Sequence, residues 1–309
     1  MKPFILILLA GLFTAIQTTG QPLTEILAYE KTELKTIVVK SGKIDSVTRF
    51  EKTVIDAFDS KVPFYHIINE RQSENKYAIL LHGLGGNKMY WIYPSEPWLQ
   101  YTRNLTAVKD SLIRLGFSLI ILDAKYHGER SYELNFGDAS YLPPGRSQNV
   151  KDAYTFYDML VSTAKEVRLL MDYAEAFHKD EAVVFYLVGY SMGGGISLLL
   201  NAVDERINGV VACVPPMGLP YSDLKDGDWP DDLTEKMKSV SPLYAAARQK
   251  SPIALFMGKK DFFIPVAEAE EFYKIVTIAD KQIRFYDAGH ELPDAFVGDV
   301  VSWMSEKIK

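Results

Sequence analysis

The sequence contains little cysteine and little histidine. Its 309 residues include a single cysteine, Cys213, and five histidines. One cysteine excludes an internal disulfide and any metal site built from several thiolates, so the stability of the fold must come from its core. The chain is 48% hydrophobic, which suits one large globular domain or two small ones.

Long basic runs are also missing. The formal net charge is −6, and charges of both signs are mixed along the chain. Because nucleic-acid surfaces require clustered Lys and Arg, we expect no nucleic-acid partner. No repeat or low-complexity tract is present. Beyond the N-terminal segment no apolar run is long enough to cross a bilayer, so we expect no stable membrane insertion of the mature chain.

The N-terminal segment is the exception among the apolar runs. Lys2 precedes an apolar stretch over residues 4–16, and small residues lie just before Gln21. This order is typical of a secretory signal peptide, and the alternative is a membrane anchor. We therefore expect residues 1–20 to be a signal peptide and residues 21–309 to form the mature domain. The protein would then be exported to the periplasm or the extracellular space.

Short apolar runs alternate with longer amphipathic segments through the mature chain. Continuous apolar strands that alternate with helices predict an α/β fold with a mostly parallel sheet covered on both faces. The first two strands are expected to form an antiparallel pair at one edge. The expected strands are residues 47–58, 61–70, 76–83, 116–124, 182–189, 207–215, 251–258 and 282–288. The expected helices are residues 97–115, 149–178, 194–203, 266–278 and 293–309.

A glycine-flanked serine lies between one expected strand and the next helix. Residues 189–193 read Gly-Tyr-Ser-Met-Gly. At such a junction the G-x-S-x-G pattern is a nucleophile elbow, which holds the serine in a strained backbone conformation. The start of the following helix favours negative charge near the hydroxyl. Ser191 is therefore the candidate nucleophile, and the alternative is a tight turn without catalysis.

A serine nucleophile requires an acid and a histidine base, which follow it in that chain order in this kind of fold. His290 is the only histidine after Ser191 and lies between an expected strand and the last helix. Asp261 follows the end of the strand 251–258, where a carboxylate can orient the imidazole. Asp287 is the next choice for the acid, although it lies close to His290 in the sequence.

Two backbone N–H groups are expected to bind the oxyanion. The first belongs to Met192, directly after the nucleophile, and the second to Leu84 in the glycine-rich loop His82–Gly86. We expect His82 to be structural. This chemistry requires neither a metal nor an organic cofactor, so none is predicted.

Taken together, the motifs resemble those of the α/β-hydrolase superfamily, and more narrowly its dienelactone-hydrolase-like and acyl-peptidase-like serine esterases. The resemblance implies an α/β-hydrolase fold with an eight-stranded, mostly parallel sheet, a Ser-Asp-His triad and hydrolysis of carboxylic esters. Dienelactone hydrolases proper use a cysteine nucleophile, whereas this chain has Ser191. Lys125 and Tyr126 replace the usual Arg-Gly of the family, so His127 is given no catalytic role. The matching segments are HGLGG at 82–86, DAKYHGERS at 123–131, GYSMGG at 189–194, GKKDFFIP at 258–265 and GHELP at 289–293.

Two polar, aromatic-rich segments lie outside the expected sheet. They cover residues of about 129–149 and 215–249, and both follow strands. Loops at the carboxyl ends of strands emerge on the catalytic face, so we expect these segments to act as small lids that select the substrate. The second segment is rich in acidic residues, which suits water better than a lipid surface. We therefore expect short acyl esters, acetyl to butyryl, to be preferred.

The sequence thus predicts an exported serine hydrolase that cleaves a small-molecule carboxylic ester through an acyl-enzyme. Two alternatives stay open. The same triad can cleave amides, so the protein could be a serine peptidase or amidase. It could also be a non-catalytic binding protein on a hydrolase scaffold. The sequence predicts neither the natural substrate nor the oligomeric state.

Overall fold

A computed structural model describes most of the chain. The expected signal peptide, residues 1–20, lies outside the described residues, as do residues 219–223 and 225–228 of the second expected lid. The described residues are 22–31, 33–71, 75–94, 100–179, 181–218, 224 and 229–308.

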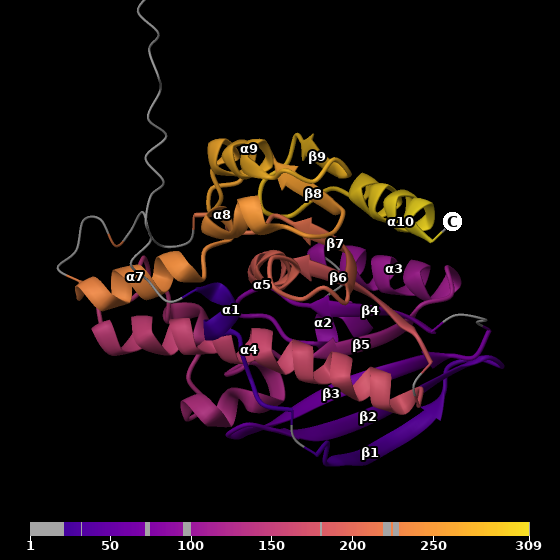
Figure 1. The fold of residues 1–309 in the computed structure, drawn as a ribbon. Helices are drawn as coiled ribbons and strands as arrows, with labels where there is room; N and C mark the ends of the chain where they lie inside the picture. The colour runs from indigo at the N-terminus through magenta and orange to yellow at the C-terminus, as the bar shows by residue number, and fades with distance from the viewer. Residues whose placement is uncertain are drawn as a thin grey trace, which may run out of the picture.

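A nine-stranded sheet forms the centre of the molecule, in the order β1-β2-β3-β5-β4-β6-β7-β8-β9 (Figure 1). The strands from β1 to β3 and the β3–β5 pair are antiparallel, and all other neighbours are parallel. The strands are β1 (Thr36–Lys43), β2 (Thr48–Ala57), β3 (Ser60–Asn69), β4 (Asn75–Leu81), β5 (Ser118–Leu122), β6 (Val183–Tyr190), β7 (Ile207–Cys213), β8 (Ile253–Gly258) and β9 (Lys281–Tyr286).

The α/β-hydrolase sheet predicted from the sequence is confirmed, but its strand count of eight is wrong because β1 was not predicted. β1 pairs only with β2 and forms the edge of the sheet. Its apolar residues Ile37, Val38 and Val39 are 65%, 51% and 59% exposed. These three residues are the only apolar run of β1, which is shorter than the roughly four to eight residues of a buried strand, because a strand that buries neither face needs no longer run.

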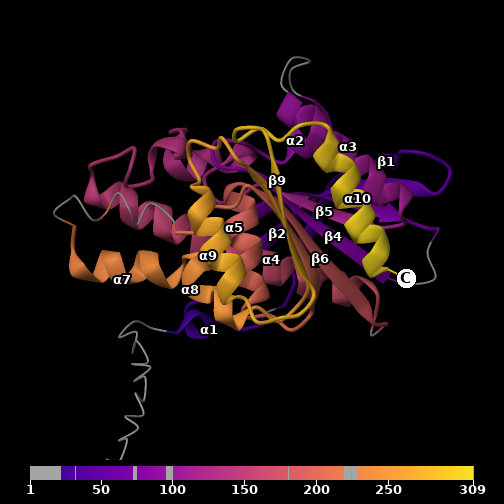
Figure 2. The ribbon, with the colours of Figure 1, turned by 90° about the horizontal axis from the view of Figure 1, so that it is seen from above.

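Helices cover both faces of the sheet, as the two views in Figures 1 and 2 show. The α-helices are α1 (Leu23–Ile26), α2 (Met89–Ile92), α3 (Gln100–Arg114), α4 (Val150–Phe177), α5 (Met192–Asn201), α7 (Asp231–Ser239), α8 (Pro242–Ala245), α9 (Val266–Ile275) and α10 (Ala295–Lys307). Short 3-10 helices are η1 (Gly128–Leu134), η2 (Ala139–Tyr141) and η3 (Ala246–Arg248). Helices α3 and α10 pack together on one face, and α4, α5, α8 and α9 lie on the other. Among the described helices, none is long and apolar enough to cross a membrane.

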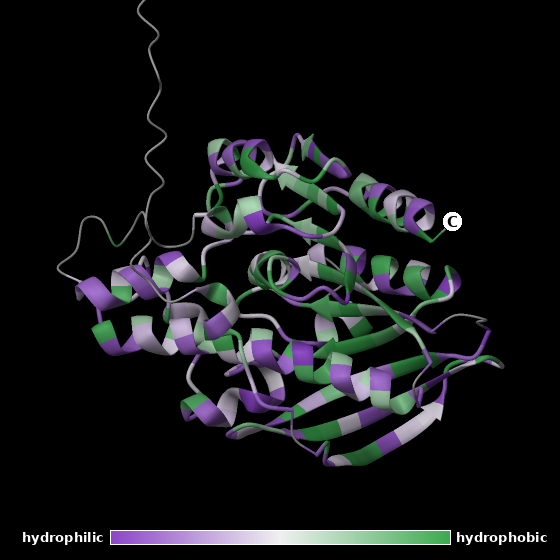
Figure 3. Cartoon of the chain, viewed as in Figure 1, coloured by the Kyte–Doolittle hydropathy of each residue, from purple (hydrophilic) through white to green (hydrophobic). Residues whose placement is uncertain are grey.

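The central strands carry the core and position the site. Every residue of β5 and β8 is buried, and hydrophobic residues dominate these strands in Figure 3. Because β4 to β9 run in parallel, their carboxyl ends meet at one edge of the sheet. Leu84, Ser191, Asp261 and His290 lie in the loops that follow β4, β6, β8 and β9, and Met192 is the first residue of α5.

Candidate active site

The turn between β6 and α5 holds Ser191 in a strained conformation, with φ 52° and ψ −119°. The Ser191 N–H donates a hydrogen bond of 2.8 Å to the carbonyl of Cys213 on β7. A Cβ atom on Gly189 would lie 2.2 Å from the carbonyl oxygen of Gly193. A Cβ atom on Gly193 would lie 2.5 Å from the carbonyl oxygen of Leu81. Only glycine fits at both positions, because the backbone of the turn passes too close to its neighbours.

The loops after β8 and β9 bring Asp261 and His290 to this serine. The Nε2 atom of His290 lies 3.0 Å from Ser191 Oγ, and its Nδ1 atom lies 2.8 Å from Asp261 Oδ2. The other carboxylate oxygen of Asp261 accepts the N–H groups of Phe263 and Ile264, at 2.8 and 3.2 Å. The Asp261 side chain is completely buried, whereas 26% of the His290 side chain is exposed. The carboxylate is therefore fixed behind an imidazole that solvent and small molecules can reach.

Asp287, the other candidate for the acid, points elsewhere. Its carboxylate forms an ion pair of 2.8 Å with Lys260 at the surface, where both side chains are largely exposed. The hydrogen bond and charge of Lys260 lower the pKa of Asp287. The structure thus brings Ser191, Asp261 and His290 together and leaves Asp287 outside the cluster.

Tyr190, the residue before the serine, holds the loop that carries His290. Its buried hydroxyl donates a hydrogen bond of 2.7 Å to the carbonyl of His290 and accepts one of 3.1 Å from the N–H of Leu292. The Tyr190 ring also packs edge-on against the imidazole, with centroids 6.1 Å apart. No role for Tyr190 is predicted from the sequence. The second residue of the elbow motif carries no local sign of a contact so distant in the chain.

The glycine-rich loop after β4 lies beside the serine. A Cβ atom on Gly83 would be 3.2 Å from the Cβ atom of Ser191. Leu84 and Met192 both line the cavity that contains Ser191. Met192 is the first residue of α5, where backbone N–H groups have no acceptor inside the helix. Both residues are placed close to the serine hydroxyl, and their role as oxyanion donors stays a prediction.

Two buried histidines fix the backbone of this loop. His127 accepts the N–H of Gly85 at Nε2, 3.0 Å away, and its Nδ1 donates to the carbonyl of Lys125 at 2.9 Å. His82 accepts the N–H of Ala124 at Nε2, also at 3.0 Å. Burial lowers the pKa of both imidazoles, to about 4 for His127. A neutral imidazole can accept an N–H bond, so burial preserves the form that these contacts require.

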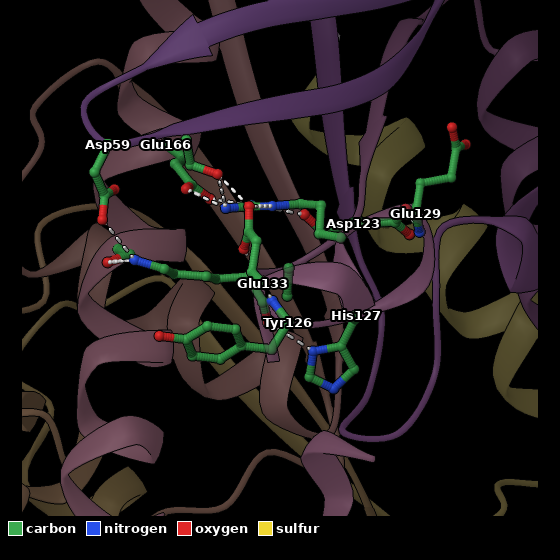
Figure 4. A network of polar contacts seen from close by, with 12 residues as sticks. Asp59, Asp123, Tyr126, His127, Glu129, Glu133 and Glu166 are labelled. Carbon is green, nitrogen blue, oxygen red and sulfur yellow. Dashed lines mark hydrogen bonds and ion pairs between the residues drawn. The ribbon is translucent and has the colours of Figure 1, made fainter. Parts of the chain in front are cut away.

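A buried ionic network supports the same loop (Figure 4). The Asp123 carboxylate accepts the backbone N–H of Lys88 at 2.8 Å and also binds the ammonium group of Lys88. Arg130 makes two hydrogen bonds to Glu166, at 2.6 and 2.7 Å. All four side chains are at most 1% exposed. Although carboxylates gather here, no group of three or more His, Cys, Asp or Glu side chains in the described part of the chain could hold a metal ion.

A cavity of about 790 Å³ opens at the serine and at His290. Its walls are mostly apolar, and both expected lid segments contribute to them. The ring of Phe263 packs edge-on against His290 at 5.3 Å between centroids. The lining residues besides Ser191, Met192, Leu84 and His290 are Pro143, Gly145, Arg146, Phe156, Leu160, Gly195, Ile196, Leu199, Pro216, Val240, Pro242, Phe262, Phe263, Ile264, Pro265 and Glu268.

A mixed sheet with a serine at a strand–helix turn, near a histidine and an aspartate from later loops, defines the α/β-hydrolase class. The model of the dienelactone hydrolase family matches residues 97–297, which is more than half of the chain. The chain therefore belongs to the dienelactone hydrolase family, and its class of enzyme is the ester hydrolases. No curated protein sequence matches it significantly.

Solved structures of esterases share the fold. Acetyl xylan esterase 1 from Thermoanaerobacterium sp. has a TM-score of 0.66 and 17% identity, over 90% of this chain and 89% of the other. A cold-adapted esterase from an Arctic intertidal metagenomic library has a TM-score of 0.64 and 13% identity, over 90% of this chain and 100% of the other. An acetyl xylan esterase from Paenibacillus sp. has a TM-score of 0.62 and 14% identity, over 92% of this chain and 91% of the other. At these identities the likeness concerns the fold.

Proposed function

We propose that this ester hydrolase is a serine enzyme in which Ser191 is the nucleophile and His290 the general base. Asp261 holds the imidazole in orientation and stabilises its protonated form. The backbone N–H groups of Leu84 and Met192 bind the oxyanion. The observation that carries the proposal is the continuous contact from Asp261 Oδ2 to His290 Nδ1, 2.8 Å, and from His290 Nε2 to Ser191 Oγ, 3.0 Å.

The reaction has two halves. In the first, His290 takes the proton of the Ser191 hydroxyl while the oxygen attacks the ester carbonyl, and the histidine then returns the proton to the departing alcohol. In the second, His290 takes a proton from water, which attacks the acyl-enzyme carbonyl, and the histidine then gives that proton to Ser191 Oγ as the acyl–oxygen bond breaks and the acid leaves. The tetrahedral oxyanion of each half lies at the start of α5, where the helix dipole favours negative charge.

The proposed substrate is a small-molecule ester with a short acyl group, acetyl to butyryl. The cavity of about 790 Å³ is within the usual size range of small-molecule sites. It is larger than a butyryl group requires, so the alcohol part fits inside as well. Two of the similar structures are named acetyl xylan esterases, which agrees with a short acyl group.

The proposal includes export of the enzyme. Residues 1–20 would be removed as a signal peptide, and residues 21–309 would form one hydrolase domain with lids at about 129–149 and 215–249. In the described part of the lids, Pro143 and Pro242 line the cavity, which is the position that a substrate-selecting segment requires. Mass spectrometry of protein from the native host would test export, and an intact Met1 would contradict it.

Substitution of the three residues tests the mechanism. Ser191→Ala and His290→Ala should each reduce kcat toward p-nitrophenyl butyrate by roughly 10⁴-fold or more, and Asp261→Asn somewhat less. Asp287→Asn is the matched control, because it removes a carboxylate from the same loop region without touching His290. Full activity in Asp261→Asn, or a large loss in Asp287→Asn, would assign the acid to another residue.

A further inference from the structure

A carboxylate lies in the otherwise apolar wall of the cavity. Glu268, on the first turn of α9, lines the cavity together with residues of α4, α5 and α8. Its side chain is half-buried. The neighbouring wall residues, such as Leu199, Val240 and Pro242, cannot donate a hydrogen bond from their side chains. A carboxylate in such surroundings is costly unless hydrogen-bond donors reach it.

In the described structure, only one of the two carboxylate oxygens of Glu268 accepts a hydrogen bond. Glu268 Oε2 accepts the backbone N–H of Gly218 at 2.9 Å. In a capping box, a glutamate at this helix position would bind the N–H of the N-cap residue, but here the N-cap is Pro265, which has no N–H. Among the described residues, no other hydrogen bond or ion pair of Glu268 occurs. Within the described part of the chain, Oε1 therefore keeps its capacity to accept a hydrogen bond from a ligand in the cavity.

The other formal charge in the cavity lining does not neutralise Glu268. Arg146 lies on the exposed rim, where it donates a hydrogen bond of 3.1 Å to the carbonyl of Ser140. Its guanidinium carbon lies 5.7 Å from the centroid of the Phe263 ring. Glu268 thus presents an acceptor, and a negative charge, to whatever fills the space beyond the ester group.

We propose that Glu268 forms a polar subsite that selects esters carrying a hydrogen-bond donor, a hydroxyl or a protonated amine, apart from the scissile carbonyl. This inference rests on the proposed ester hydrolysis at Ser191 and adds to it the substrate class. An ester without a donor leaves Oε1 desolvated and unpaired in the complex, so the site penalises it. A substrate carboxylate at the same place meets a like charge and is excluded.

Three pairs of esters distinguish the possible positions and kinds of donor. 2-Hydroxyethyl butyrate and propyl butyrate differ by a hydroxyl on the alcohol side. 2-(Dimethylamino)ethyl butyrate and 3-methylbutyl butyrate differ by a protonated amine at that side. p-Nitrophenyl 3-hydroxybutyrate and p-nitrophenyl 3-methylbutyrate differ by a hydroxyl on the acyl side. In each pair a methyl group or a carbon atom replaces the donor, so size is nearly unchanged.

The test compares wild-type enzyme with Glu268→Gln, using Glu271→Gln as the control. Glutamine keeps a carbonyl oxygen for the Gly218 N–H, and Glu271 is an exposed acid on the same helix. In at least one pair, wild-type kcat/KM should favour the donor ester by roughly tenfold or more, as expected for a hydrogen bond to a charged group. Glu268→Gln should remove most of that preference: kcat/KM should fall for the donor ester, and it should stay the same or rise for the donor-free ester, because an unpaired amide costs less to desolvate than an unpaired carboxylate. Glu271→Gln should change neither the donor preference nor kcat/KM for the donor-free ester.

The result that overturns the subsite is a preference that survives in Glu268→Gln, an equal loss for both members of every pair, or no donor preference in the wild type. A binding measurement distinguishes failure of the proposed subsite from failure of the proposed ester hydrolysis. In a Ser191→Ala background, donor esters should raise the Tm more than their isosteres, and adding Glu268→Gln should abolish the difference. Donor-selective binding without hydrolysis in the wild type refutes the proposed mechanism and leaves the subsite standing. Hydrolysis without such selectivity refutes the subsite alone.

Discussion

At the scale of single residues, the conformation of Ser191 depends on backbone contacts that admit no side chain at Gly189 or Gly193. We expect Gly189→Ala to reduce the free energy of unfolding by at least about 2 kcal/mol, because the new methyl group collides with the Gly193 carbonyl. Gly298→Ala is the control. A Cβ atom at Gly298, inside α10, meets nothing within 4 Å, so alanine there should stabilise by about 0.5–1 kcal/mol. Urea unfolding measures the free energy of unfolding of both variants. Equal stability of Gly189→Ala and Gly298→Ala would contradict the requirement for glycine at position 189.

Tyr190 provides a second prediction at this scale. Tyr190→Phe removes only the hydroxyl that joins His290 and Leu292, so the imidazole should lose its fixed position. We expect kcat to fall by roughly 10- to 100-fold with little change in KM, because small misplacements of a catalytic group are costly. Tyr186→Phe is the matched control, since Tyr186 lies on the same strand and its hydroxyl donates to the carbonyl of Lys307 instead of to the loop of His290. Equal activity of Tyr190→Phe and wild type would show that the hydroxyl does not position His290.

At the scale of structural elements, the loop after β4 depends on a neutral His127. Its pKa is lowered from 6.5 to about 4 by burial. Between these values the unfolded chain binds a proton that the folded chain does not, so stability falls as the pH decreases through this window. The free energy of unfolding should therefore decrease less over this pH window in His127→Gln than in the wild type, by roughly 1–3 kcal/mol. Urea unfolding at pH 7.5, 6, 5 and 4 measures the slope, and an identical slope in both proteins would contradict this role.

The sequence predicted those elements and site residues whose pattern is local. The buried parallel strands are continuous apolar runs, and Ser191 lies in a five-residue motif between a strand and a helix. His290 was predicted because no other histidine follows the serine. The exposed edge strand β1 has an apolar run of only three residues, which is too short to predict a strand. The Tyr190–His290 contact spans 100 residues and the Lys88–Asp123 pair spans 35, so only the folded chain reveals them.

At the scale of the whole molecule, a buried arginine joins helix α4 to the antiparallel part of the sheet. Arg130 binds Glu166 of α4 and donates to the Ser60 hydroxyl of β3 at 3.1 Å. Arg130→Met should destabilise the fold by roughly 3–5 kcal/mol, because it leaves Glu166 buried without its partner. The double variant Arg130→Met/Glu166→Leu should recover much of that loss. Denaturant unfolding tests both, and a double variant less stable than Arg130→Met would contradict the explanation.

The central claim is that the whole fold serves to make one hydroxyl nucleophilic. Labelling of the folded enzyme with a fluorophosphonate, followed by peptide mass spectrometry, tests this most directly, because the reagent reacts with activated serines. We predict a single adduct on Ser191, and a rate of labelling that is strongly reduced in His290→Ala and unchanged in Asp287→Asn. An enzyme that hydrolyses esters while Ser191 stays unlabelled, or that is labelled equally fast without His290, would contradict the claim.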